Sequence, residues 1–143
     1  YPPSGDGVGG FRGDKTADAT MLDGLVDPDP FPAWASPADL QVYADAMHAG
    51  GWTGPLNRYR AQPLDAEQLG SRPDPNLKQP ATFIGGELDM VRHFVEGVDT
   101  YDFAPMACDD YRGTTLIDGA GHWVQQEAPA AVNAALEAFV AGL

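Results

Sequence analysis

Two stretches decide the fold: ATFIGGELDM at residues 81–90 and TTLIDGAGHW at residues 114–123. Each contains a short apolar run, at 81–86 and 114–118, that is typical of a buried strand and leads into a glycine-containing turn. Asp89 follows the first run and His122 follows the second. Since ligands bind beyond the carboxyl ends of strands in open α/β sheets, the pattern predicts that both side chains lie at the functional edge.

Helical patterns surround these strands. Ser36 and Pro37 suit the start of a helix that ends at Gly50-Gly51, and Pro129 opens a final helix. Between the strands, one helical face is predicted from the apolar positions Met90, Val91, Phe94, Val95 and Val98. Residues 1–37 are expected to be irregular, 51–65 to form a turn and a short helix, and 70–80 to be a linker. The order strand, helix, strand, helix predicts a parallel α/β sheet, whose other strands must come from elsewhere.

Composition excludes several classes of protein. Only 28 of the 143 residues are Leu, Ile, Val or Phe, and the net charge is -13. Such a chain has too few large aliphatic side chains for a self-sufficient core, so we expect either that much of it is loop or that it is part of something larger. The acid excess argues against nucleic acid as a partner, and no apolar run approaches the ~20 residues of a membrane span. The lone Cys108 excludes an internal disulfide, and the absence of a signal-like start favours the cytoplasm.

The order of the two polar residues points to a reaction class. An acid followed by a histidine is the order of the last two triad members in α/β-hydrolases, where the carboxylate orients the imidazole and the imidazole moves a proton. The alternative is structural: Asp89 caps a turn and His122 is an ordinary histidine. His93 lies four residues after Asp89, but no third ligand is evident, so we expect neither a metal nor a cofactor.

Three segments resemble the epoxide hydrolase branch of the α/β-hydrolase superfamily. IDGAGHWVQQEAP (117–129) resembles the family's catalytic-histidine motif, and ATFIGGELDMV (81–91) resembles its acid-bearing strand and turn. WTGPLNRYR (52–60) resembles the segment that carries one of two tyrosines of the cap domain. These segments follow the family's order, and the similarity runs from about Pro32 to the C-terminus.

The resemblance implies an α/β-hydrolase fold, present as the C-terminal part of a mostly parallel sheet with helices on both faces, together with part of a mainly helical cap. Residues 1–72 would belong to the cap and 73–143 to the core. The implied reaction is the opening of an epoxide to a vicinal diol through an alkyl-enzyme ester. Asp89 would be the orienting acid, His122 the base that activates water, and Tyr59 an acid toward the epoxide oxygen.

The family's Asp nucleophile and second cap tyrosine have no counterpart in this sequence, so the resemblance implies that the N-terminal part of the same protein supplies them. Whether the protein forms a homodimer does not follow from the sequence. Trp123 is expected to pack beside His122 or to contact the substrate, and Glu127 to cap the last helix. Two hypotheses compete with this one. The first is another α/β-hydrolase, either a haloalkane dehalogenase or a serine esterase, and the second is a non-catalytic chain, either an interaction fragment or a binding module.

Overall fold

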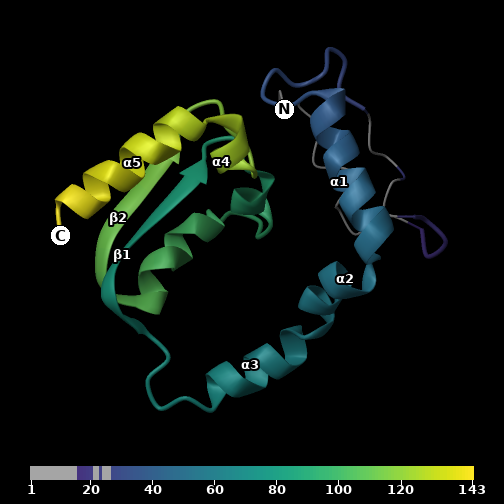
Figure 1. Cartoon of the computed structure of the whole chain (residues 1–143). Coiled ribbons are helices and arrows are strands. Elements are labelled where there is room, and N and C mark those ends of the chain that lie inside the picture. Colours follow the sequence, from purple (N-terminus) through teal and green to yellow (C-terminus); the bar gives the residue numbers. More distant parts are fainter. Residues whose placement is uncertain (1–15, 21–22, 24–26) are drawn as a thin grey trace.

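The computed structural model describes residues 16–20, 23 and 27–143. It begins with three helices, α1 (Pro37–Gly50), α2 (Thr53–Arg60) and α3 (Gln62–Gly70). Strand β1 (Leu77–Gly86) is followed by two 3₁₀ helices, η2 (Met90–His93) and η3 (Thr100–Ala107), and then by strand β2 (Cys108–Ile117). The chain ends with α4 (Val124–Glu127) and α5 (Pro129–Ala141). Figure 1 shows α1, α2 and α3 as an arm that runs from the top of the strand pair round to its lower end.

The two strands are parallel, as the order of elements predicted. Phe83 lies opposite Thr114, and Gly86 lies opposite Ile117. Since side chains alternate between the faces of a strand, neighbouring β1 residues meet different helices. Ile84 packs against the buried cluster of Ile117, Ala120, Val124 and Val132 on the α5 side, whereas the Phe83 ring contacts Tyr101 of η3. Helical elements therefore cover both faces of the strand pair (Figure 1).

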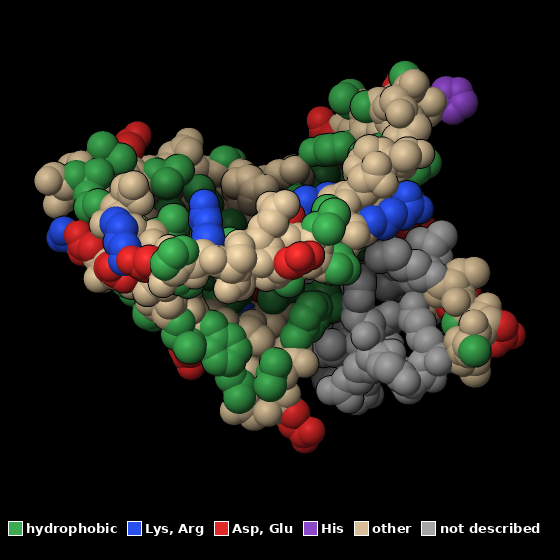
Figure 2. Space-filling view, turned by 90° about the horizontal axis from the view of Figure 1, so that it is seen from below, with side chains coloured by type: hydrophobic (Ala, Val, Ile, Leu, Met, Phe, Trp, Pro, Cys, Tyr) green, Lys and Arg blue, Asp and Glu red, His purple; other side chains and the backbone are tan. Residues whose placement is uncertain are grey.

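The hydrophobic core is small. Among the described residues, the buried hydrophobic side chains are the four of that cluster. Large apolar side chains such as Leu77, Phe103 and Met106 stay exposed, and Figure 2 shows hydrophobic side chains across the surface seen from below. Two strands do not complete a parallel sheet, because both faces and both edges need cover. The structure thus contains a part of such a sheet.

Helix α1 begins and ends as its sequence predicted. Ser36 and Asp39 form a capping box in which Asp39 N–H donates to Ser36 Oγ at 3.2 Å and Ser36 N–H donates to Asp39 Oδ2 at 2.8 Å. Pro37 occupies the first turn, where a missing N–H costs nothing. Gly51 ends the helix with φ at 72°, in the left-handed region that favours glycine. In the part of the chain that is described, no helix combines the length and apolarity needed to cross a bilayer.

The segment between the strands differs from the prediction. Instead of a helix through residues 90–98, η2 ends at His93, and a bridge between Val95 and Val98 turns the chain at Gly97, where φ is 75°. Asp89 and Asp99 each cap the 3₁₀ helix that follows them, so the apolar spacing was outweighed by local caps and a glycine turn. The strands also begin earlier than predicted, at Leu77 and Cys108, because polar residues at an exposed strand end carry no apolar signal.

Gly86 fixes how closely the two strand ends approach. A Cβ at this position would lie 2.1 Å from the carbonyl oxygen of Gly121 and 2.3 Å from that of Ala120. Both atoms belong to the backbone, which cannot rotate away as a flexible side chain can. Only glycine therefore allows the turn after β1 to lie directly against the turn after β2.

We expect Gly86→Ala to lower the free energy of unfolding by about 3 kcal/mol, because the added methyl group forces the two turns apart. Urea unfolding of the protein that carries this chain measures the loss. Gly54→Ala is the matched control, since a Cβ at Gly54 meets nothing within 4 Å. Equal unfolding midpoints for the two variants would contradict the close contact.

Candidate active site

The turns after β1 and β2 are joined by hydrogen bonds. Glu87 N–H donates to the carbonyl of Ile117 at 3.0 Å, and Leu88 N–H donates to that of Ala120 at 2.8 Å. The Glu87 side chain adds a third link, because its Oε2 accepts from Gly119 N–H at 3.2 Å. These links bring the residues that come next in the two turns close together at the carboxyl edge of the strands.

Those two residues are Asp89 and His122, as the sequence predicted. They are 33 positions apart, yet Asp89 Oδ2 lies 2.9 Å from Nδ1 of His122. Asp89 is only 3% exposed, whereas the His122 side chain is 55% exposed. A buried carboxylate thus orients an accessible imidazole. The other ring nitrogen, Nε2, does not contact Asp89 and can take part in proton transfer.

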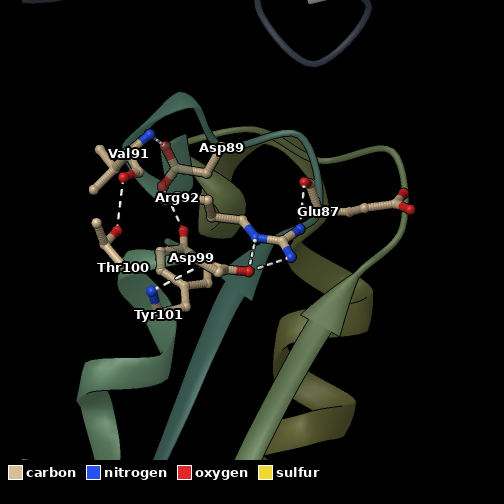
Figure 3. A network of polar contacts seen from close by, with 7 residues as sticks. All are labelled: Glu87, Asp89, Val91, Arg92, Asp99, Thr100 and Tyr101. Carbon is tan, nitrogen blue, oxygen red and sulfur yellow. Dashed lines mark hydrogen bonds and ion pairs between the residues drawn. The ribbon is translucent and has the colours of Figure 1, made fainter. Parts of the chain in front are cut away.

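The Asp89 carboxylate also accepts two hydrogen bonds from the segment between β1 and β2. Val91 N–H donates to Oδ1 at 2.9 Å, and the Tyr101 hydroxyl donates to Oδ2 at 2.5 Å (Figure 3). Burial by itself raises the pKa of Asp89, but the hydrogen bonds from Tyr101, Val91 and His122 outweigh it and hold the pKa below its usual value. The carboxylate is therefore ionised at neutral pH.

Tyr101 belongs to a polar network beside the acid. Burial, together with its hydrogen bond to Asp89, raises the pKa of Tyr101, so the hydroxyl stays protonated and donates. Asp99 Oδ1 accepts from Tyr101 N–H at 3.0 Å, and Asp99 Oδ2 pairs with Arg92. The Arg92 guanidinium also donates to the carbonyl of Glu87 at 2.8 Å, so the network returns to the turn after β1 (Figure 3).

Glu127 supports the turn that bears His122, and its predicted role as cap of the last helix was wrong. It is the last residue of α4, where its Oε2 accepts from Gly121 N–H at 2.6 Å and its Oε1 accepts from Trp123 N–H at 2.9 Å. These two amides flank His122 on either side. The carboxylate thus fixes the backbone on which the imidazole stands, and α5 begins without a side-chain cap.

The other two predicted site residues lie differently. Trp123 packs edge-on against the His122 ring, with centroids 5.5 Å apart, and is more than half exposed. Tyr59 lies on α2 and is 68% exposed. Among the described residues, the hydrogen-bond partners of the Asp89 side chain are Val91, Tyr101 and His122, so the structure does not join Tyr59 to this carboxylate.

The sequence did not predict several residues that support the Asp89 carboxylate. Asp99 before Thr100 and Tyr101 repeats the local pattern of an aspartate that caps a short helix, and that pattern could have predicted η3. No spacing rule places Tyr101 against a carboxylate twelve positions earlier, because the contact depends on the fold of the whole connection.

Comparison with known proteins finds matches over most of the chain. Epoxide hydrolase B of Mycobacterium tuberculosis is 37% identical over 87% of this chain and 35% of its own length, and epoxide hydrolase A of the same organism is 39% identical over 95% of this chain and 44% of its own. The crystal structure of epoxide hydrolase A from Mycobacterium thermoresistibile superposes with a TM-score of 0.77 at 35% identity and covers 90% of this chain and 39% of that one. An epoxide hydrolase from an endophytic Streptomyces gives the same TM-score at 36% identity, over 88% of this chain and 37% of that one. No protein-family profile matches.

The parallel strands, the helices on both faces and the Asp–His pair beyond the strand ends define part of an α/β-hydrolase fold. Within that class, the chain is a homologue of the epoxide hydrolases, as its motifs indicated. It spans less than half the length of these curated relatives.

We expect Glu127→Ala to destabilise the protein by about 1–3 kcal/mol, because two amides lose their shared acceptor at a partly buried site. Urea unfolding measures the loss, and Glu137→Ala, on the exposed side of α5, is the matched control. Broadening of the His122 ring signals in the NMR spectrum of Glu127→Ala should accompany the loss. A variant as stable as the control, with unchanged ring signals, would show that Glu127 does not support the turn.

Proposed function

We propose that this chain is part of an epoxide hydrolase, an enzyme that opens an oxirane with water to a vicinal diol. The observation that carries the proposal is the Asp89–His122 pair, a buried and ionised carboxylate 2.9 Å from an accessible imidazole. The names of the relatives support it, since epoxide hydrolases match 87% and 95% of the chain. The nucleophile is assigned to an Asp from the N-terminal part of the same protein.

The first step forms an ester. The nucleophilic carboxylate attacks one oxirane carbon, and the carbon–oxygen bond of the ring breaks with its electron pair on oxygen. That oxygen is a poor leaving group unless it gains a proton, so an acid is needed beside it. We assign this role to Tyr59, which is exposed on α2 and is therefore available to a substrate.

The second step releases the diol. His122 takes a proton from water, and the resulting hydroxide adds to the ester carbonyl. When the adduct collapses, the diol oxygen leaves and receives the proton from His122, while the remaining proton of the water returns to Tyr59. Asp89 stays ionised throughout, because its task is to orient the imidazole and to stabilise the imidazolium that forms.

The same proposal divides the chain at the linker before β1. Residues 1–72 would be part of a cap over the substrate, and residues 73–143 part of the core. In support, α1, α2 and α3 contribute no side chain to the buried cluster beside the strands. Among the described residues, a side-chain hydrogen bond joins the two parts near the site: Gln126 Nε2 donates to the Tyr43 hydroxyl at 2.9 Å.

The full-length protein should convert an aryl epoxide to its diol, and His122→Gln should accumulate the ester, because ester hydrolysis needs the base. Intact-protein mass spectrometry detects the ester as the added mass of the epoxide. His48→Gln, at an exposed position in the last turn of α1, is the matched control and should turn over normally.

Labelled water sharpens this test. In a single turnover in ¹⁸O water the diol should carry no label, because its new oxygen comes from the nucleophilic carboxylate and the label enters the enzyme. Label in the first diol formed, or no added mass on a His122→Gln protein that binds the epoxide, would overturn the ester mechanism.

Tyr59→Phe should lower kcat/KM for the epoxide at least about tenfold, since general acid catalysis contributes about 10²- to 10⁴-fold in total. Tyr111→Phe is the control, because Tyr111 lies on β2 and its hydroxyl bonds to Thr114. The comparison also separates epoxide opening from dehalogenation, in which a halide leaves without a proton. An unchanged kcat/KM would remove Tyr59 from the mechanism.

A further inference from the structure

We propose that Tyr101 is a positioning residue for the ester-hydrolysis step, an inference that rests on the proposed function: its hydroxyl holds the Asp89 carboxylate in the orientation in which Oδ2 accepts from His122. The geometry is direct. Asp89 Oδ2 accepts from the Tyr101 hydroxyl at 2.5 Å and lies 2.9 Å from His122 Nδ1. The same oxygen thus bridges η3 and the turn after β2.

Tyr101 can fix the acid because its own ring is held on several sides. It packs edge-on to Phe83 with centroids 4.6 Å apart, and the Arg92 guanidinium lies 5.7 Å from the ring centroid. On the strand side, a Cβ at Gly85 would lie only 2.4 Å from Cε2 of the ring, so glycine is what admits the tyrosine. The hydroxyl therefore has a defined position relative to β1.

The backbone of Tyr101 is held as well. Asp99 accepts its N–H at 3.0 Å and pairs with Arg92, and the hydroxyl of Thr100 donates to the carbonyl of Val91 at 2.7 Å. Val91 N–H of η2 donates to Asp89 Oδ1, and the Tyr101 hydroxyl of η3 donates to Oδ2, so the two 3₁₀ helices hold both carboxylate oxygens (Figure 3). His122 approaches the second oxygen from the other turn.

Without the hydroxyl, Val91 N–H would be the remaining donor from this side of the carboxylate. Rotation about the Cβ–Cγ bond would then carry Oδ2 away from His122 Nδ1, and the imidazole would lose the acceptor that fixes its tautomer. Ester hydrolysis needs the imidazole as a base, whereas the attack on the oxirane does not. The inference is therefore specific to one of the two steps.

The test is Tyr101→Phe in the full-length protein, studied by rapid-quench single turnovers with an aryl epoxide. The rate constant for ester hydrolysis should fall about tenfold, as expected when one hydrogen bond to a charged group is lost, while the rate constant for ester formation stays unchanged. In steady state, kcat and KM should fall together and leave kcat/KM intact when hydrolysis limits turnover. Tyr111→Phe should change neither step.

Partial unfolding does not obscure the result, because the amount of ester formed counts the folded sites and the rate constants refer to those sites alone. Unchanged hydrolysis, or an equal loss in both steps, would overturn the positioning role. If the wild-type protein forms no ester, the proposed function fails, and the contact is judged separately from the NMR signal of the His122 Nδ1 proton. That signal should move in Tyr101→Phe and not in Tyr111→Phe, and an unmoved signal would overturn the inference.

Discussion

The close contact between the turns after β1 and β2 is the constraint on which the site depends. A parallel pair of strands brings its carboxyl ends to one edge, but it does not by itself put two particular side chains within hydrogen-bond distance. That step follows from Gly86, which lets the backbone carbonyls of Ala120 and Gly121 approach where any Cβ would clash. Because the amides of Glu87 and Leu88 then bond across the gap, Asp89 meets His122 from 33 positions away.

Burying a carboxylate is unfavourable unless its charge is compensated, and the site solves this with hydrogen bonds from three separate segments. Val91 lies in η2, which Asp89 caps, Tyr101 comes from η3, and His122 comes from beyond β2. Two of the three contacts form only in the tertiary fold. The ionised form of Asp89 is therefore stabilised only when the site is assembled. Removing either partner would leave a buried charge with fewer donors, which costs more than the net value of one hydrogen bond.

The sequence predicted the elements whose signals are local. The cap of α1 at Ser36 and Pro37, the start of α5 at Pro129 and the two glycine turns all follow from residue types that impose their own backbone geometry. It failed over residues 90–98, where an apolar spacing of three and four also fits a 3₁₀ turn with a glycine bend. It identified Asp89 and His122, because strand order alone brings them to one edge, and it missed Tyr101 and the true role of Glu127, because their partners are set by tertiary packing.

The polar site and the exposed apolar side chains differ in how the structure supports them. Around Asp89 and His122, every element that supports the pair lies between Phe83 and Glu127, so the polar partners of the acid and the backbone anchors of the base come from one continuous stretch. The large apolar side chains of the described residues, by contrast, are mostly exposed. A stretch built in this way fixes the Asp89–His122 pair although the hydrophobic core beside it is small. The orientation of the His122 ring is therefore set by contacts within this one stretch.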